Sequence, residues 1–153
     1  MKINMSKSNK NKEEARLTKK GRSGSRQLLL QALYQHQLNG DGFDVLFSQL
    51  KQTKEFSQID QTHFKNLLQE ILKNPDKLDK ISSKHLDRPN EQLDPIERAI
   101  IWIGLTELLS HQDTPANVVI NEAIELAKIY GAQDSYQFIN GVLDSFLKEQ
   151  SPR

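Results

Sequence analysis

The apolar residues between Ala116 and Leu147 recur every three or four positions, in two separate series. Such spacing is typical of helices that pack one face inward. The first series comprises residues 119, 123, 126 and 130, and the second comprises residues 139, 142, 143 and 146. The pattern predicts two helices joined by a short turn. We expect Gly131 to end the first helix in a left-handed conformation, and Asp134 with Gln137 to cap the second.

The same period continues through the rest of the chain from about residue 25, and no alternating pattern of a strand is present. It predicts further helices over about 25–39, 43–50, 64–72, 74–86 and 94–111. The 94–111 helix is apolar around most of its circumference and should run through the middle of the domain. The expected fold class is therefore all-α, with about seven helices in one domain of two packed groups, residues 22–73 and 74–150.

Several boundary residues add detail to this prediction. Asn74, Asp94 and Thr114 each precede a proline, so each is expected to cap a helix that begins at that proline. Glu97, three residues after Asp94, would complete a reciprocal capping box. We expect Gly141 to allow close approach of another backbone, and the glycine-rich segment 21–25 to act as a hinge.

Composition and charge restrict the function further. The 153 residues contain no cysteine, which excludes disulfides, thiolate metal sites and cysteine nucleophiles. No apolar run suits a membrane span or a secretory signal, so a cytoplasmic location is expected. Residues 1–26 hold nine lysines and arginines against two glutamates, a net of about +7, which leaves about −6 for the remainder of a chain with a total of +1. Residues 1–21 should form a disordered basic arm, either a ligand for a polyanion or a solvated tail.

The sequence contains little that points to catalysis. The four histidines, His36, His63, His85 and His111, show no metal-ligand spacing, and a phosphate-binding loop, a dinucleotide fingerprint and a nucleophile elbow are all missing. Glu122 and Glu125 could serve acid–base chemistry, but no nucleophile or electrophile accompanies them, so a solvated face is the better interpretation. We expect neither an enzyme nor a bound cofactor or metal.

Several motifs carry a specific resemblance. Residues 119–128 read VINEAIELAK, residues 130–131 read YG and residues 138–144 read FINGVLD. Upstream support comes from Arg26, QALY at 31–34, Arg88, ERA at 97–99 and TEL at 106–108. Over about residues 22–148 the chain resembles the NusB family of bacterial transcription antitermination factors. The resemblance implies an all-helical protein that pairs with the ribosomal protein NusE on single-stranded boxA RNA of ribosomal RNA leaders. The complex would support read-through by RNA polymerase.

The resemblance also implies an RNA-binding surface. Its candidate residues are Lys19, Lys20, Arg22, Arg26, Tyr34, Lys128, Gln133, Asp134, Ser135 and Phe138. The family's arginine-rich helix start corresponds to Arg22 and Arg26, which would neutralise phosphates, but Ser23 and Gly24 replace two arginines often found between them. Tyr34 and Phe138 could stack on bases or belong to the core, and Asp134 could contact RNA or only cap its helix. Lys128 could contact RNA or compensate the dipole of its helix.

The resemblance places NusE on the middle helices. The candidate partner residues are Leu78, Ile81, His85, Leu86 and Trp102. Trp102 stands where the family commonly has arginine, so it is either a core residue or an interface anchor.

Two other functions stay open at this point. A NusB-like domain also precedes the catalytic domain of some ribosomal RNA methyltransferases, although 153 residues leave no room for a methyl-donor fold. A helical adaptor that binds protein but no RNA is the second alternative, and the basic arm disfavours it. We expect a monomer or weak homodimer without membrane association.

Overall fold

The structure, a computed structural model, describes residues 19–150 and contains seven α-helices over that range. They are α2 (Gly21–Asn39), α3 (Phe43–Leu50), α4 (Gln61–Lys73), α5 (Pro75–Ser83), α6 (Pro95–Ser110), α7 (Ala116–Tyr130) and α8 (Ser135–Gln150). Two short 3-10 helices, η1 (Lys54–Gln58) and η2 (Asn90–Gln92), lie in the connections. The all-α prediction is confirmed, whereas residues 1–18 of the predicted basic arm lie outside the described residues. The segment 21–25 is not a hinge, because it forms the first turn of α2.

Side-chain caps fix several helix starts. The side chains of Asp60, Asn74 and Asp94 accept hydrogen bonds from backbone N–H groups three residues later, at 3.0, 3.2 and 2.8 Å. Each cap satisfies a donor that the first helical turn leaves without an intrahelical partner. Thr114 does not cap α7 as predicted, since Pro115 occupies the N-cap position. The Asp94 capping box is also incomplete, because the carboxylate of Glu97 accepts a 2.9 Å hydrogen bond from the hydroxyl of Ser135 instead.

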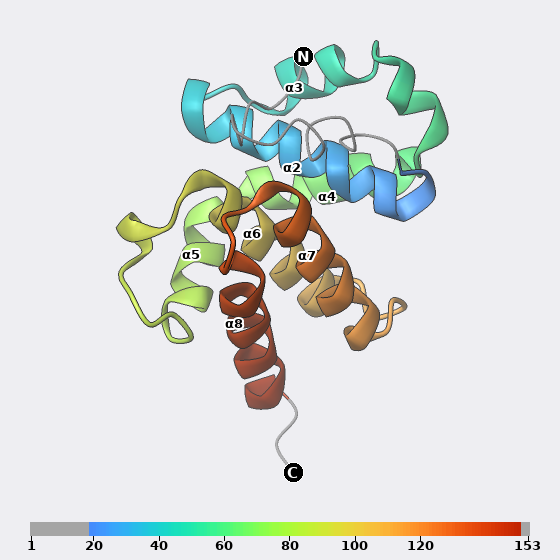
Figure 1. Cartoon of the computed structure of the whole chain (residues 1–153). Helices are drawn as coiled ribbons and strands as arrows, with labels where there is room; N and C mark the ends of the chain where they lie inside the picture. The colour runs from blue at the N-terminus through green and yellow to red at the C-terminus, as the bar shows by residue number, and fades with distance from the viewer. Residues whose placement is uncertain (1–18, 151–153) are drawn as a thin grey trace.

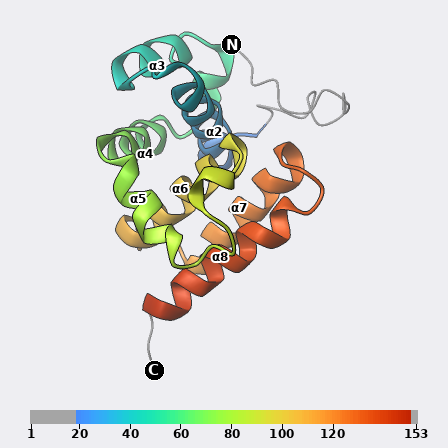
Figure 2. The ribbon, with the colours of Figure 1, turned by 90° about the vertical axis from the view of Figure 1, so that its left-hand side faces the viewer.

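Helix α6 runs through the middle of the molecule, as its apolar circumference predicted. It packs against α2, α4, α5, α7 and α8. Figures 1 and 2 show α2, α3 and α4 on one side of it and α5, α7 and α8 on the other. Residues 99–107 of α6 are all buried, so this helix contributes to the core in every direction. A single hydrophobic core therefore joins the two predicted helical groups.

The glycine that permits close helix packing is Gly104, not Gly141. A Cβ at Gly104 would lie 2.8 Å from Leu143 Cδ1 of α8, so the Leu143 side chain would have to shift. Gly141 is exposed, and a Cβ there would meet nothing within 4 Å. The prediction for Gly141 was wrong because its place on the outer face of α8 depends on the rotation of that helix, which spacing alone gives only approximately.

The turn between α7 and α8 differs in detail from the prediction. Gly131 has φ −88° and ψ 177°, an extended conformation rather than a left-handed one. A Cβ at this position would lie 2.8 Å from the carbonyl oxygen of Ala127, so the tight turn still requires glycine. Gln137 does not complete a cap, because its amide donates to the hydroxyl of Tyr136 at 3.2 Å.

Within residues 19–150, no helix is both long and apolar enough to traverse a lipid bilayer.

Candidate nucleic-acid interface

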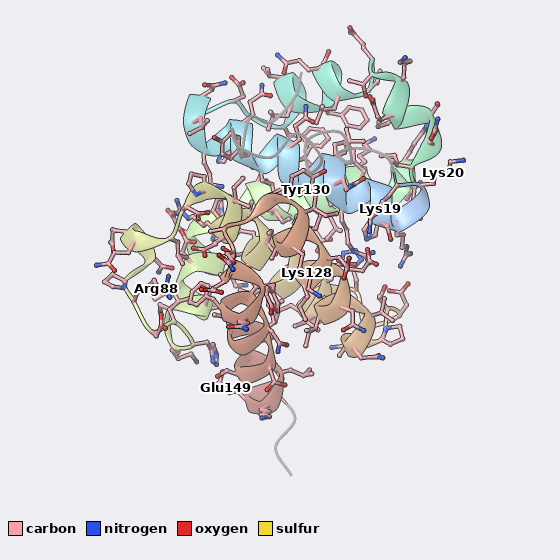
Figure 3. The ribbon with its side chains drawn as sticks, viewed as in Figure 1. Lys19, Lys20, Arg88, Lys128, Tyr130 and Glu149 are labelled. Atoms are coloured by element: carbon pink, nitrogen blue, oxygen red, sulfur yellow. The ribbon has the colours of Figure 1, made fainter. Side chains whose placement is uncertain are left out.

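The segment that leads into α2 is attached to the end of α7. The backbone N–H of Lys19 donates to the side-chain oxygen of Gln27 at 3.1 Å, and the amide of Gln27 donates to the hydroxyl of Tyr130 at 3.2 Å. Gly24 allows this close passage, because a Cβ there would lie only 2.3 Å from the carbonyl oxygen of Lys19. Figure 3 shows Lys19 and Lys20 at the start of α2, and Lys128 with Tyr130 on α7.

This arrangement gives Gly24 a positive role. The resemblance implied that Gly24 costs the protein a phosphate ligand, whereas the structure shows that any side chain there would displace the Lys19 backbone. Gly24 does not itself contact a phosphate, but its lack of a side chain allows Lys19 to lie where it does.

Arg22 lies at the other end of α7 and remains accessible. Its guanidinium donates to the hydroxyl of Thr114 at 2.8 Å and forms long ion pairs with Asp60 at 3.4 Å and Asp113 at 3.6 Å. The backbone N–H of His63 and, less strongly, the Arg22 guanidinium lower the pKa of Asp60. With 43% of its side chain exposed, Arg22 can exchange these surface contacts for a phosphate.

Arg26 departs most clearly from the sequence prediction. It is 3% exposed, and its guanidinium forms two 2.7 Å hydrogen bonds with Glu107 of α6 and a third, at 3.2 Å, with Glu122 of α7. All of its charge is thus neutralised inside the fold. A phosphate cannot reach this buried side chain, so the predicted RNA contact of Arg26 is wrong. Its role is structural, because it holds α2 against α6 and α7.

Glu107 is the centre of this buried network. Burial alone would raise its pKa, but the hydrogen bonds from Arg26 and His63 outweigh that effect and lower it to about 2. His63 contacts Glu107 through Nε2 at 3.1 Å and the hydroxyl of Ser25 through Nδ1 at 2.7 Å. The order serine, histidine, carboxylate is that of a hydrolase triad. Here all three residues are buried, so a substrate cannot reach the hydroxyl and the network is structural.

The α7–α8 turn presents a second group of accessible polar residues. Lys128, Gln133 and Asp134 are exposed, and Asp134 directly precedes the first residue of α8. Ser135, however, is 4% exposed and its hydroxyl is held by Glu97, so the structure does not offer it to RNA.

The aromatic candidates also differ from one another. Tyr34 is half-buried and packs against the core, and Phe138 is half-buried with the guanidinium of Arg88 4.1 Å from its ring centroid. Tyr136, which the sequence argument missed, is half-buried with the ammonium of Lys128 5.1 Å from its ring centroid. These two residues meet across the turn, so neither helical period nor sequence proximity could indicate their contact.

We define the α2–α7 surface as the accessible residues at the start of α2, near the end of α7 and at the α7–α8 turn. They are Lys19, Lys20, Arg22, Lys128, Gln133, Asp134 and Tyr136. The surface combines four cations, the amide of Gln133, the carboxylate of Asp134 and the ring of Tyr136. These groups neutralise phosphates, bond to base edges and stack on bases in single-stranded RNA readers. Within residues 19–150 no cluster of three or more histidine or acidic side chains could hold a metal ion.

The predicted partner residues are mostly internal. Trp102 is 2% exposed, and its indole N–H donates to Asp79 at 2.9 Å, which makes it a core residue rather than an interface anchor. Leu78 is 7% exposed, and the side chain of His85 is held by Ser145 at 2.8 Å and Glu149 at 3.2 Å. Ile81 and Leu86 are half-buried and remain accessible in part.

Comparison with known proteins identifies the family. The NusB family model matches residues 23–148. The chain is 41% identical to the transcription antitermination protein NusB of Alcanivorax borkumensis over 132 residues, which cover 86% of this chain and 88% of that protein. It is 43% identical to the NusB of Pseudomonas syringae pv. tomato over 123 residues, covering 80% and 74%.

Solved structures agree with this result. A structure of T. maritima NusB has a TM-score of 0.73 and 29% identity, covering 85% of this chain and 92% of that chain. A complex of the antitermination factors NusB and NusE with dsRNA contains a chain of the same fold, with a TM-score of 0.72, 24% identity and coverage of 83% and 96%. The motifs, the helical architecture and these similarities lead to one conclusion: the chain belongs to the NusB family of transcription antitermination proteins.

Proposed function

We propose that this protein binds single-stranded boxA-type RNA together with NusE and thereby supports read-through by RNA polymerase. The observation that carries the proposal is the Lys19–Gln27–Tyr130 connection, which holds the basic start of α2 beside the polar α7–α8 turn. Family membership supports a role in antitermination, since the curated relatives are antitermination proteins and not enzymes. Such a role places the protein in the cytoplasm with the transcription machinery.

The RNA contact is expected to be mainly electrostatic. Lys19, Lys20, Arg22 and Lys128 supply the accessible cations of the α2–α7 surface, whereas Arg26 is withheld inside the fold. Few fixed cations mean modest affinity for the protein alone. A partner that binds this protein and also contacts RNA makes the second contact effectively intramolecular, so the pair should bind one RNA much more tightly.

Ile81 and Leu86 are the remaining candidates for the NusE surface. Both lie at or just beyond α5, are half-buried and pack at the edge of the core, so a partner could cover their accessible parts. A charge introduced at such a position opposes burial in an interface. Leu86→Glu should therefore abolish the affinity gain that NusE provides and leave RNA binding by the protein alone intact.

The test is a titration of fluorescently labelled boxA-type RNA with this protein, with and without NusE. We expect tight binding only with both proteins present, and competition by a double-stranded form of the same RNA should be weaker. Lys65→Gln, which removes an exposed cation on α4 outside both the α2–α7 surface and the proposed NusE surface, serves as the control. Equal affinity with and without NusE would refute the proposed pairing.

A further inference from the structure

Tyr136 and Lys128 form an aromatic–cation pair at the α7–α8 turn. The ammonium of Lys128 lies 5.1 Å from the ring centroid of Tyr136, and the tyrosine hydroxyl accepts a 3.2 Å hydrogen bond from Gln137. Tyr136 lies in the first turn of α8, is half-buried and packs against the core. The core contacts therefore fix the position of Tyr136, while its side chain stays partly accessible.

We propose that Tyr136 and Lys128 form a binding site for one nucleobase, in which the base stacks on the tyrosine ring and the lysine pairs with an adjacent phosphate. This inference rests on the proposed RNA-binding function and names the residues that would hold a base. Aromatic side chains hold bases splayed out of single-stranded RNA by stacking. The ammonium of Lys128 sits on a flexible four-carbon stem, so it can leave the ring face and approach a phosphate oxygen.

Other aromatic residues near this surface are less suited to the same task. Tyr130 is buried, with its hydroxyl bonded to Gln27. One face of Phe138 is covered by the guanidinium of Arg88 at 4.1 Å, and a guanidinium spreads over a ring more completely than an ammonium does. Tyr34 is half-buried against the core on α2, much as Tyr136 is on α8, but within residues 19–150 no lysine or arginine lies over its ring. Tyr136 combines an accessible ring with a cation that can move away.

The experiment uses boxA-type RNA that carries 2-aminopurine at one position at a time, in the presence of NusE. Stacking quenches 2-aminopurine fluorescence, so a position that binds Tyr136 should be quenched by the unchanged protein. Tyr136→Leu keeps an apolar side chain against the core but removes the ring face. Tyr136→Phe keeps the ring and loses only the hydroxyl bond to Gln137. Phe43→Leu on α3, a helix that α2 separates from the α7–α8 turn in Figures 1 and 2, is the matched aromatic control.

We expect Tyr136→Leu to abolish quenching at one position and to weaken binding roughly 5- to 150-fold, the range for loss of one base–aromatic stack. The salt dependence of RNA affinity should be the same for Tyr136→Leu and the unchanged protein, because the substitution removes no phosphate contact. Tyr136→Phe and Phe43→Leu should behave like the unchanged protein. Thermal melting of each variant confirms that it is folded.

The alternative results are distinct. Unchanged quenching and affinity in Tyr136→Leu would refute the base-binding site while leaving RNA binding intact. An equal loss in Tyr136→Phe would refute stacking in favour of a role for the hydroxyl. If the unchanged protein with NusE does not bind the RNA, the proposed function itself fails.

Discussion

Arg22 and Arg26 lie one turn apart on the same helix, and the sequence predicted the same phosphate-binding role for both. The structure separates them. Arg22 keeps 43% of its side chain exposed and makes ion pairs of 3.4 and 3.6 Å, whereas Arg26 is 3% exposed and is held by 2.7 Å bonds to Glu107. The difference teaches that a basic helix start can contain both an accessible arginine and a buried ion pair that holds the fold together. Residues i and i+4 share one helix face, so position along α2 separates the two arginines: Arg22 lies at the exposed start of the helix, and Arg26 lies where α2 packs against α6 and α7.

The largest expected effect is on folding stability at Arg26. Arg26→Ala leaves the buried carboxylate of Glu107 without its main partner, and breaking such a pair costs about 3–5 kcal/mol of unfolding free energy. Arg22→Ala, whose contacts are exposed, should cost less than about 1 kcal/mol. Denaturant unfolding of both variants measures the difference. Similar losses for the two arginines would show that burial does not distinguish their roles.

A pH titration sharpens the same contrast. The pKa of Glu107 is lowered from 4.5 to about 2 in the fold, so the folded state binds this proton more weakly than the unfolded chain does. The resulting stabilisation is fully present above about pH 4.5 and is lost as the pH falls toward 2. Its size is on the order of 3 kcal/mol, because each pKa unit corresponds to about 1.4 kcal/mol. Unfolding free energies measured between these pH values should show this loss.

Glu107→Gln provides the control for the titration. This variant has no titratable group at the position, so it should start less stable at neutral pH and lose less stability on acidification. An acid dependence identical to that of the unchanged protein would contradict the assignment of the effect to Glu107.

Two glycines extend the comparison of buried and exposed positions to smaller effects. Gly104→Leu forces atoms into the space filled by Leu143 and should destabilise the fold by about 1–3 kcal/mol. Gly141→Ala adds a methyl group where nothing lies within 4 Å and should stabilise α8 by about 0.5–1 kcal/mol. Thermal melting should show a lower melting temperature for Gly104→Leu and a higher one for Gly141→Ala. A lower melting temperature for Gly141→Ala would show that its face of α8 is covered.

The sequence predicted the helices well because a 3.6-residue period and capping side chains are local signals. Asp94 and Asn74 cap their helices as expected, and Gly40 ends α2 with a φ of 77°. The errors concern helix rotation and contacts between distant segments. Glu97 and Ser135 are 38 residues apart and form a hydrogen bond with each other. Because of this bond, Glu97 does not complete the predicted capping box and Ser135 does not belong to the predicted RNA surface.

The candidate site was predictable only in part for the same reason. Lys19, Lys20, Lys128 and Gln133 are accessible, as their polar character suggested, but their arrangement depends on the Gln27–Tyr130 bond across 103 residues. Trp102 could not be assigned from sequence, because both a core and an interface favour tryptophan. Its contacts with Asp79 and Arg98 place it inside. Whether the accessible residues contact RNA stays a prediction.

The smallest expected effect concerns Arg22 and Lys128. Substituting them tests whether these accessible side chains contribute to RNA binding and not to folding stability. Arg22→Gln and Lys128→Gln should each leave unfolding free energy nearly unchanged, since both side chains are exposed. Each should reduce the slope of log affinity against log salt by about 0.7, the value for one phosphate contact on a single strand. Lys148→Gln, at the opposite end of α8 and paired with Asp144 at 3.1 Å, removes the same charge away from the α2–α7 surface and should leave the slope intact. A slope change shared by all three variants would mean that RNA senses only the net charge of the protein and not this surface.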